Sequence, residues 1–427
     1  MKKAIFAFLL IIIGISVVEG INRKSIFTRL YGRGTTEPFR TIVFENDSSR
    51  LVDMDQNVLE FPYDKEKLNN FFNKLDRLLT RHEGHITLWH VGGSHVQGDM
   101  FSHRMRVNFS TLVPDIVGNR GMIFPFAMAR TNYDRNYHMT YTGRWSTERN
   151  ISRSLSMRLG ITGIAAQTTD SLSSITLNLN MGKFPTWKFD RLRILGYASS
   201  EVEMWSEDKR GRVAYPLHDA DNDSYIFDYN EYHDSITVYF SLHRGESFTL
   251  TGVEPINTQP GISYYSSGIN GAAAGSWLRC KDLERDLALI KPDVALWAIG
   301  INDAAVPSSK FDEEVFMRNY RKLINKVNRV SPDCLHIFIT NNDTYRKGSA
   351  NINAEAVDEA FRNLAIEYNG CIWNVYEIMG GLGSSTRWRS AGLMQSDRIH
   401  FTRLGYELLG DLLFNAIMYE YMHPSSH

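Results

Sequence analysis

Residues 85–95 read HITLWHVGGSH, a short apolar run that ends at Gly92-Gly93-Ser94. The run has the length of a buried strand, and the two glycines indicate a tight turn. Residues 99–112, which follow, have apolar side chains at helical spacing. The stretch therefore predicts a strand, a turn and a helix, with Ser94 at the point where the strand ends.

The same unit returns twice toward the C-terminus. Residues 294–299 and 334–340 predict strands, and residues 311–327 and 354–368 predict the helices that follow them. A further amphipathic helix is predicted over residues 65–79, before the first strand. Strands that alternate with helices favour a parallel sheet covered on both faces. We therefore expect an α/β domain.

The segment between these units has a different pattern. Polar and apolar residues alternate without helical periodicity, which predicts short strands over residues 154–165, 174–179, 187–195, 224–229, 235–240 and 247–250. Such strands, separated by turn residues, are typical of an all-β sandwich or jelly roll. The expected division is a leader over residues 1–20, an N-terminal arm over 21–62, a first α/β part over 63–145, an inserted β-sandwich over 146–257, and a second α/β part over 258–427.

The charge balance and the N-terminal residues bear on the partners and the location of the protein. The 427 residues include 47 Lys and Arg against 48 Asp and Glu, and this balance gives no attraction to nucleic acid. Lys2 and Lys3 precede an apolar run over residues 4–18, which predicts a signal peptide and a periplasmic or secreted protein. An uncleaved membrane anchor is the alternative, whereas cleavage would leave no stable membrane insertion.

The chain has three cysteines, Cys280, Cys334 and Cys371. Their odd number and wide spacing favour neither a disulfide framework nor a CxxC metal site. We expect three buried thiols.

Four short blocks carry chemistry by their combination and order: GGSH at 92–95, GING at 268–271, GIND at 300–303 and DRIH at 397–400. A serine hydroxyl needs a base to act as a nucleophile at neutral pH, and His400 is the candidate base for Ser94. A carboxylate that holds the other ring nitrogen would complete a triad, and Asp397 suits this role. We therefore predict Ser94, Asp397 and His400 as catalytic residues.

An acyl-transfer site also needs donors for the developing oxyanion. The backbone N–H of Ser94, the N–H of Gly271 and the side-chain amide of Asn302 fit this role. Because these groups would supply the nucleophile and the charge stabilisation, we expect no metal and no organic cofactor. The sequence assigns no substrate-binding residue.

The four blocks resemble the signature of the SGNH (GDSL-like) hydrolase superfamily. The resemblance covers roughly residues 84–130 and 258–420, and it implies a flavodoxin-like three-layer sandwich with Ser94, Gly271, Asn302, Asp397 and His400 in the roles given above. Gly93 stands where the family usually has an aspartate that helps to hold the turn. Position 96 is Val, so the GxSxG motif of α/β-hydrolases is not met.

Ser94 and Gly271 lie 177 residues apart, and this long insertion, with the strings GGSHVQGD and SSGINGA, is similar to bacterial peptidoglycan O-acetylesterases. Their inserted β-sandwich resembles a carbohydrate-binding module. The resemblance implies a secreted serine acetylesterase with an acylated polysaccharide substrate, most directly peptidoglycan. Alternatives are an esterase or O-acetyltransferase acting on plant or host glycans, and a carbohydrate-binding protein with an inactive SGNH domain.

Other polar residues near the blocks have structural and functional interpretations. His85, His90 and His95 invite a metal hypothesis, but their spacing favours packing or polar contacts. We expect Gln97 and Asp99 at the start of the helix after the turn, and Asp303 as a cap or as a partner that orients Asn302. Arg387 and Trp388 lie in a glycine-rich loop before DRIH, where they could face the substrate.

Overall fold

The computed structural model describes residues 51–112, 116–133, 136–181, 187–346 and 349–423. The expected leader over residues 1–20 and most of the arm lie outside this part of the chain. No helix of the described residues is long and apolar enough to cross a membrane.

A six-stranded parallel sheet forms the centre of the α/β part, in the order β19-β16-β15-β1-β14-β2. Its strands are β1 (His85–Gly92), β2 (Val117–Asn119), β14 (Gly261–Gly268), β15 (Val294–Ala298), β16 (Leu335–Ile339) and β19 (Cys371–Trp373). The predicted strands at 85–91, 294–299 and 334–340 are therefore present. The pattern missed β14, which follows directly on the inserted strands.

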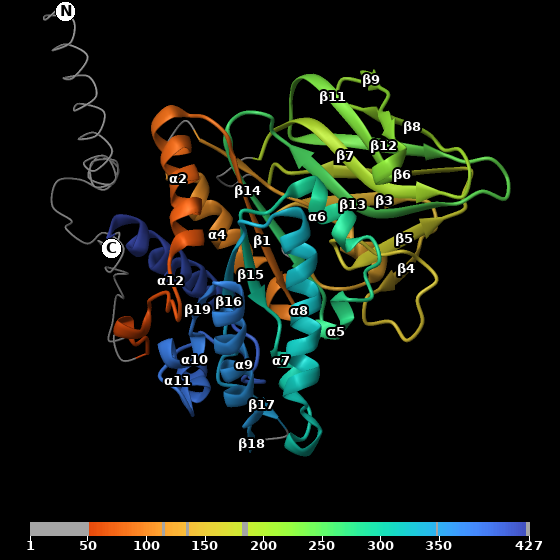
Figure 1. The fold of residues 1–427 in the computed structure, drawn as a ribbon. Coiled ribbons are helices and arrows are strands. Elements are labelled where there is room, and N and C mark those ends of the chain that lie inside the picture. The colour runs from red at the N-terminus through yellow and green to blue at the C-terminus, as the bar shows by residue number, and fades with distance from the viewer. Residues whose placement is uncertain (1–50, 113–115, 134–135, 182–186, 347–348, 424–427) are drawn as a thin grey trace, which may run out of the picture.

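Helices cover both faces of this sheet, as the alternation predicts. Ile86 and Leu88 of β1 share one buried cluster with α2 (Glu66–Arg81), α4 (Met100–Ser110) and α12 (Arg403–Met422). Trp89 and Val91 point to the other face and share a cluster with α6 (Leu283–Ile290), α8 (Glu313–Val330) and α9 (Asn353–Tyr368). Figure 1 shows α2 and α12 on one side of the sheet and α8 on the other. The expected α/β class with three layers is confirmed.

Short helices occupy the loops around the sheet. They are α3 (Ser94–Gln97), α5 (Ala274–Trp277), α7 (Ile301–Ala304), α10 (Val375–Ile378) and α11 (Ser384–Ser390), with 3-10 turns at Met54–Gln56, Phe126–Ala129, Ala220–Asn222 and Ser308–Lys310. A small hairpin, β17 (Tyr345–Arg346) and β18 (Ser349–Ala350), follows β16. Two of these helices, α3 and α7, begin two and three residues after the last residues of β1 and β15, respectively.

The inserted segment forms two antiparallel sheets packed against each other. One has the order β10-β11-β7-β13-β5-β4, with β4 (Ser146–Arg149), β5 (Ile164–Thr168), β7 (Phe189–Ala198), β10 (Leu217–Asp219), β11 (Ser224–His233) and β13 (Phe248–Ile256). The other has the order β3-β6-β12-β8-β9, with β3 (His138–Thr142), β6 (Leu172–Asn178), β8 (Glu203–Glu207), β9 (Val213–Ala214) and β12 (Ser235–Ser241). This confirms the expected all-β insertion.

Two details of the insertion differ from expectation. Residues 154–165 do not form a strand: the chain turns there, and β5 begins only at Ile164. In addition, β3 precedes residue 146, and it pairs along β6 from His138↔Asn178 to Thr142↔Ser174. We therefore propose that the inserted domain begins at or before His138.

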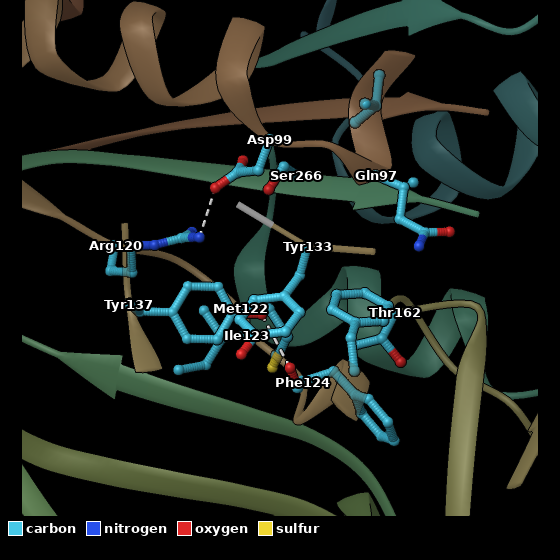
Figure 2. Close-up of a pocket in the computed structure, with 13 residues that line it drawn as sticks. Gln97, Asp99, Arg120, Met122, Ile123, Phe124, Tyr133, Tyr137, Thr162 and Ser266 are labelled. Atoms are coloured by element: carbon cyan, nitrogen blue, oxygen red, sulfur yellow. Dashed lines mark hydrogen bonds and ion pairs between the residues drawn. The ribbon is translucent and has the colours of Figure 1, made fainter. Parts of the chain in front are cut away.

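A buried ionic network supports the helix after the first turn. Asp99 is 5% exposed and accepts hydrogen bonds from Arg106 and Asn136. It also accepts a hydrogen bond from Arg120, and Figure 2 shows this contact. Burial opposes ionisation of Asp99, but the two guanidinium groups outweigh it and lower the pKa of the carboxyl. Asp99 lies at the start of α4, as expected, but its side chain makes no capping bond, and its carboxylate neutralises two buried arginines instead.

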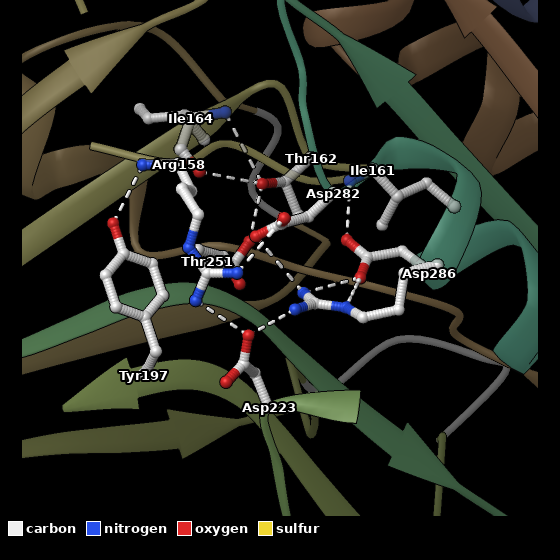
Figure 3. A network of polar contacts seen from close by, with 10 residues as sticks. Arg158, Ile161, Thr162, Ile164, Tyr197, Asp223, Thr251, Asp282 and Asp286 are labelled. Carbon is white, nitrogen blue, oxygen red and sulfur yellow. Dashed lines mark hydrogen bonds and ion pairs between the residues drawn. The ribbon is translucent and has the colours of Figure 1, made fainter. Parts of the chain in front are cut away.

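A second network joins the sandwich to α6 (Figure 3). Asp223, which precedes β11, pairs with Arg158 and Arg285. Arg285 also donates to Asp286, which is fully buried and accepts the backbone N–H of Ile161 at 2.9 Å. Burial raises the pKa of Asp286 to about 6. Charged groups from both parts of the chain therefore meet at their junction.

We predict that Asp286→Ala lowers the free energy of unfolding by about 3 kcal/mol, because it removes a buried partner of Arg285 and leaves the Ile161 N–H unsatisfied. Urea denaturation measures this change. Asp228→Ala is the matched control: it breaks the solvent-exposed pair with Arg191 and should cost roughly 0–1 kcal/mol. Equal effects of the two substitutions would contradict the junction role of Asp286.

Candidate active site

Ser94 occupies the turn that the sequence predicts. It is the first residue of α3, one residue beyond the two glycines at the end of β1. The first N–H groups of a helix have no partner within the helix, so the Ser94 N–H is available to a ligand. Gly98 donates back to the Ser94 carbonyl at 3.2 Å, and this bond closes the short helix. The turn therefore presents both the hydroxyl and the amide of Ser94.

His400 and Asp397 lie beside Ser94, although 306 residues separate the serine from the histidine. The distance from Ser94 Oγ to His400 Nε2 is 2.8 Å, and the distance from His400 Nδ1 to Asp397 Oδ2 is 2.7 Å. A hydrogen on Nδ1 satisfies both contacts, because Nδ1 then donates to the carboxylate and Nε2 accepts from the hydroxyl. The three predicted residues thus form one continuous hydrogen-bonded chain.

The loop that carries Asp397 and His400 is closed by its own backbone bonds. Gln395 N–H donates to the His400 carbonyl at 2.8 Å, and Asp397 Oδ1 accepts the N–H groups of Ile399 and His400 at 2.9 and 3.0 Å. Partial burial works against ionisation of Asp397, but the hydrogen bonds from His400 and the two backbone donors outweigh it and lower the pKa of the carboxyl. Asp397 is therefore held as a carboxylate facing the imidazole.

The candidate oxyanion donors lie at the neighbouring turns. Gly271 has a φ of +82° and is exposed, and Asn302 is the second residue of α7. Asn302 Nδ2 donates one hydrogen to the Ala272 carbonyl at 3.0 Å, which leaves its second hydrogen for a ligand. A Cβ atom on Gly93 would lie 2.8 Å from Asn302 Nδ2. Glycine in place of the usual aspartate therefore makes room for the Asn302 amide.

Asp303 ties two of the blocks together. Its carboxylate accepts the N–H of Ala274, at the start of α5, with both oxygens at 3.2 Å. Burial raises the pKa of Asp303 to about 6. The expected capping role of Asp303 is thus found at the helix after Gly271, not in the loop that follows Asp303 itself. This contact fixes the distance between the Gly271 turn and the Asn302 turn.

Gln97 is a site residue whose role the sequence did not reveal. Its side-chain oxygen accepts the N–H of Asn270 at 2.6 Å, and its amide nitrogen donates to Thr131 Oγ1 at 2.9 Å and to the Asn132 carbonyl at 2.7 Å. The Gln97 side chain therefore joins α3 to the residue before Gly271 and to the segment after Arg130. A glutamine at the end of a four-residue helix gives no local signal of contacts 34 and 173 residues away.

The three histidines around β1 do not converge on a metal. His85 is exposed at the start of the strand, and His90 is buried, where its Nδ1 lies 3.2 Å from Ser102 Oγ and 3.0 Å from Tyr264 Oη. His95 contacts Tyr406 Oη at 2.9 Å and packs against the His400 ring, with 5.3 Å between ring centroids. Burial lowers the pKa of both His90 and His95 to about 3, so both rings are neutral at neutral pH.

Among the described residues, Asp208, Glu231 and His233 form the one group of potential ligands whose donor atoms lie within 4.8 Å of one another. Arg212 pairs with both carboxylates and Arg210 also pairs with Glu231, so two cations compensate the two negative charges. The group lies on the inserted sheets, away from Ser94 in the sequence and in the topology. It does not contribute to the candidate active site.

Trp388 does not face a substrate. It is fully buried, donates its indole N–H to the Leu51 carbonyl at 2.8 Å and packs on Phe401. The exposed Arg387 donates to the carbonyls of Met379 and Gly380. Of the two interpretations of Trp388, the structural one therefore holds, because this part of the loop forms a helix that packs its tryptophan inward.

Two pockets border the site. One lies between α3 and the entry to the sandwich, and Gln97, Asp99, Tyr133, Tyr137 and Thr162 are among the residues that line it (Figure 2). The lining of the other includes His95, Ile301, Phe401 and Tyr406. Neither pocket was predicted, because each combines residues from distant parts of the chain.

Residues 234–408 match the GDSL-like Lipase/Acylhydrolase family, a range that includes Gly271, Asn302, Asp397 and His400 but not Ser94. No curated protein matches the sequence. In fold, the chain is similar to a peptidoglycan O-acetylesterase, with a TM-score of 0.68 and 18% identity over 86% of this chain and 99% of that chain.

Two further solved structures are similar over less of the fold. An acetylxylan esterase from Geobacillus stearothermophilus has 17% identity over 39% of this chain and 74% of its own, with a TM-score of 0.28. A family two carbohydrate esterase from Cellvibrio japonicus has 10% identity over 66% of this chain and 98% of its own, also with a TM-score of 0.28. These two similarities are too weak for any inference.

The family match over residues 234–408 and the shared fold agree with the expected SGNH-type (GDSL-like) superfamily and support a serine carboxylesterase. The expected fold class is confirmed. Within this class, the extent of the similarity to the peptidoglycan O-acetylesterase shows that the two chains share their architecture, including a segment long enough to hold the inserted sandwich.

We predict that His90 makes the fold sensitive to acid. In the folded state its pKa is about 3, because protonation would place a charge on the buried Nε2, which has no partner among the described residues. The unfolded state takes up this proton near pH 6.5. The contribution of neutral His90 to the free energy of unfolding is therefore fully present above pH 6.5 and is lost as the pH falls toward 3.

When the pH is lowered from 7.5 to 4.5, the free energy of unfolding of wild type should therefore fall by about 2–3 kcal/mol more than that of His90→Gln. Urea denaturation at a series of pH values measures the free energy of unfolding of both proteins. Titrating groups that both proteins share contribute equally, so they cancel in the difference between the two pH curves. Parallel pH curves for the two proteins would show that His90 is protonated in the folded state as readily as in the unfolded state.

Proposed function

We propose that the protein is a serine carbohydrate esterase that removes O-acetyl groups from a polysaccharide, most directly peptidoglycan, through an acyl-Ser94 intermediate. The observation that carries the proposal is the continuous chain of hydrogen bonds from Ser94 Oγ to His400 and from His400 to Asp397. This arrangement supplies a nucleophile, a base and an orienting carboxylate in contact distance of one another.

In the acylation step, His400 Nε2 takes the hydroxyl proton as Ser94 Oγ attacks the carbonyl carbon of the ester. The negative charge develops on the carbonyl oxygen, which the N–H groups of Ser94 and Gly271 and the free amide hydrogen of Asn302 stabilise. Asp397 stabilises the imidazolium that forms. The bond between the acyl carbon and the sugar oxygen then breaks, and His400 returns its proton to that oxygen.

Deacylation repeats these steps with water as the nucleophile. His400 takes a proton from the water, the water oxygen attacks the acyl carbon, and the same donors receive the oxyanion. The bond from the acyl carbon to Ser94 Oγ breaks, His400 returns the proton to Ser94, and acetate leaves. The exposure of Gly271 and the partial exposure of His400 give water a route to the intermediate.

Two observations support an acetylated glycan as the substrate. The fold similarity extends over 99% of a peptidoglycan O-acetylesterase, so it includes the inserted sandwich and not only the hydrolase part. The pattern of Lys2, Lys3 and the apolar residues 4–18 supports export to a compartment where such glycans occur. We propose a periplasmic or secreted location on this basis.

We predict that wild type releases p-nitrophenol from p-nitrophenyl acetate and acetate from O-acetylated peptidoglycan, and that Ser94→Ala lowers kcat for both by roughly 10³-fold or more, because the nucleophile is lost. Spectrophotometry follows the first substrate, and an enzymatic acetate assay follows the second. Ser396→Ala, at an exposed serine of the loop before His400, is the control and should retain activity. An active Ser94→Ala protein would refute the role of Ser94.

Gly93→Ala tests the oxyanion arrangement. The added Cβ would lie 2.8 Å from Asn302 Nδ2 and should push the amide away from the oxyanion. We expect kcat for p-nitrophenyl acetate to fall by about 10²-fold, the order of effect seen when one oxyanion donor is lost. Gly98→Ala is the matched control, since its Cβ would lie 3.3 Å from the flexible end of Met100 and at an ordinary contact distance of 3.7 Å from the Ser94 carbonyl oxygen. Equal kcat values for both variants would exclude Asn302 as a donor.

A further inference from the structure

Arg398 lies between two members of the proposed triad in an unusual backbone conformation. Its φ is +55°, and its N–H donates to the Gln395 carbonyl at 3.2 Å within the closed loop that carries Asp397 and His400. For a residue with a Cβ, the left-handed region costs roughly 1–2 kcal/mol, and glycine or asparagine avoids most of this strain. A long cationic side chain at this position is therefore not explained by the turn itself.

The Arg398 side chain is held in place by an aromatic ring. Its guanidinium carbon lies 3.7 Å from the centroid of the Tyr345 ring, close enough for a cation–π contact. Stacking uses the face of the guanidinium group and leaves the N–H donors at its edge free. Tyr345 thus orients the group without consuming its hydrogen-bonding capacity.

No described residue satisfies those donors. Within residues 51–112, 116–133, 136–181, 187–346 and 349–423, Arg398 forms no ion pair and its side chain donates no hydrogen bond to a protein acceptor. Other arginines near the site differ: Arg104 makes a two-pronged contact with Asp411, and Arg106 is neutralised by Asp99. Arg398 is thus a cation beside the triad without an acidic partner in the described protein.

The topology places this pair along the edge that carries the site. The adjacent parallel strands β1, β15 and β16 end in the segments that hold Ser94, Asn302 and Tyr345, and neighbouring strands lie about 4.8 Å apart. Asn342 Nδ2 donates to the Ile399 carbonyl at 3.2 Å, so the segment after β16 is bonded directly to the loop of His400. A polymer that presents an ester to Ser94 can therefore extend past Arg398.

We propose that Arg398, stacked on Tyr345, binds a carboxylate of the acylated glycan, and that the preferred substrates are acidic glycans. This inference rests on the proposed esterase function and names its substrate class. The planar guanidinium edge matches a carboxylate with two parallel hydrogen bonds. The carboxylate can belong to a uronic acid or to an acidic substituent of a peptidoglycan sugar, since both offer the same chemistry.

The test compares kcat/KM for acetate release from three acetylated polymers: a polyuronate, O-acetylated peptidoglycan and neutral mannan. We expect wild type to prefer the carboxylated polymers, and Arg398→Gln to lower the ratio of carboxylated to neutral kcat/KM by about tenfold, with Arg398→Lys in between. Because the contact is partly exposed, added salt should reduce the preference of wild type but not the residual ratio of Arg398→Gln. Comparison of the two acidic polymers identifies the source of the carboxylate.

The ratio of kcat/KM on carboxylated polymers to kcat/KM on neutral mannan separates recognition of the carboxylate from any effect of the substitution on the triad. A purely structural role for Arg398 would lower kcat/KM on all three polymers equally and leave the ratio unchanged, which would overturn the proposal. Tyr345→Leu, which removes the stacking partner and keeps the cation, should lower the same ratio and provides the test if Arg398→Gln fails to fold. Hydrolysis of p-nitrophenyl acetate by wild type separates failure of the Arg398 proposal from failure of the proposed esterase function. If wild type does not hydrolyse this ester, the esterase function itself is refuted.

Discussion

The candidate site depends on the parallel pairing of β1 with its two neighbours. β1 pairs with β14 from His85↔Gly261 to Gly92↔Gly268, and with β15 from Leu88↔Val294 to Gly92↔Ala298. Because parallel strands end at one edge of a sheet, the turns that carry Ser94, Gly271 and Asn302 meet there. A shift of β1 by one residue would exchange the side chains that pack on the two helical layers, so the packing of Ile86 and Leu88 on one face and of Trp89 and Val91 on the other also fixes the position of the site.

Glycines allow these turns to approach as closely as the chemistry requires. A Cβ on Gly92 would lie 2.4 Å from Val96 Cγ2, and a Cβ on Gly268 would lie 2.1 Å from the Gln97 backbone nitrogen. Together with Gly93, which makes room for Asn302, these residues bring α3 against β14 and the amide of Asn302 against the turn. The glycines in the sequence blocks thus serve close packing around Ser94, whereas Gly271 also supplies a positive φ.

The inserted sandwich is part of the same packed body and not a loosely attached module. Its core residues share one cluster with Trp89, Val91 and the helices on one face of the parallel sheet. Arg158 and Arg285 join Asp223 of the sandwich to the first turn of α6, and Gln97 holds the segment that leads into the insertion. The long insertion in the sequence therefore does not separate Ser94 from the other blocks in space. Thr162 of the insertion also lines one of the two pockets.

The sequence by itself determined the types of element and the chemistry of the blocks. The apolar runs and the glycine turns predicted β1, β15 and β16 with their helices, and the order of Ser94, Gly271, Asn302, Asp397 and His400 indicated an SGNH-type esterase, because these properties reside in short stretches of chain. Only the tertiary structure decided which distant groups meet. The ionic role of Asp99, the bridging role of Gln97, the burial of Trp388 and the stacking of Arg398 on Tyr345 depend on contacts between separate segments, and no local pattern encodes the distance between two atoms that the fold alone brings together.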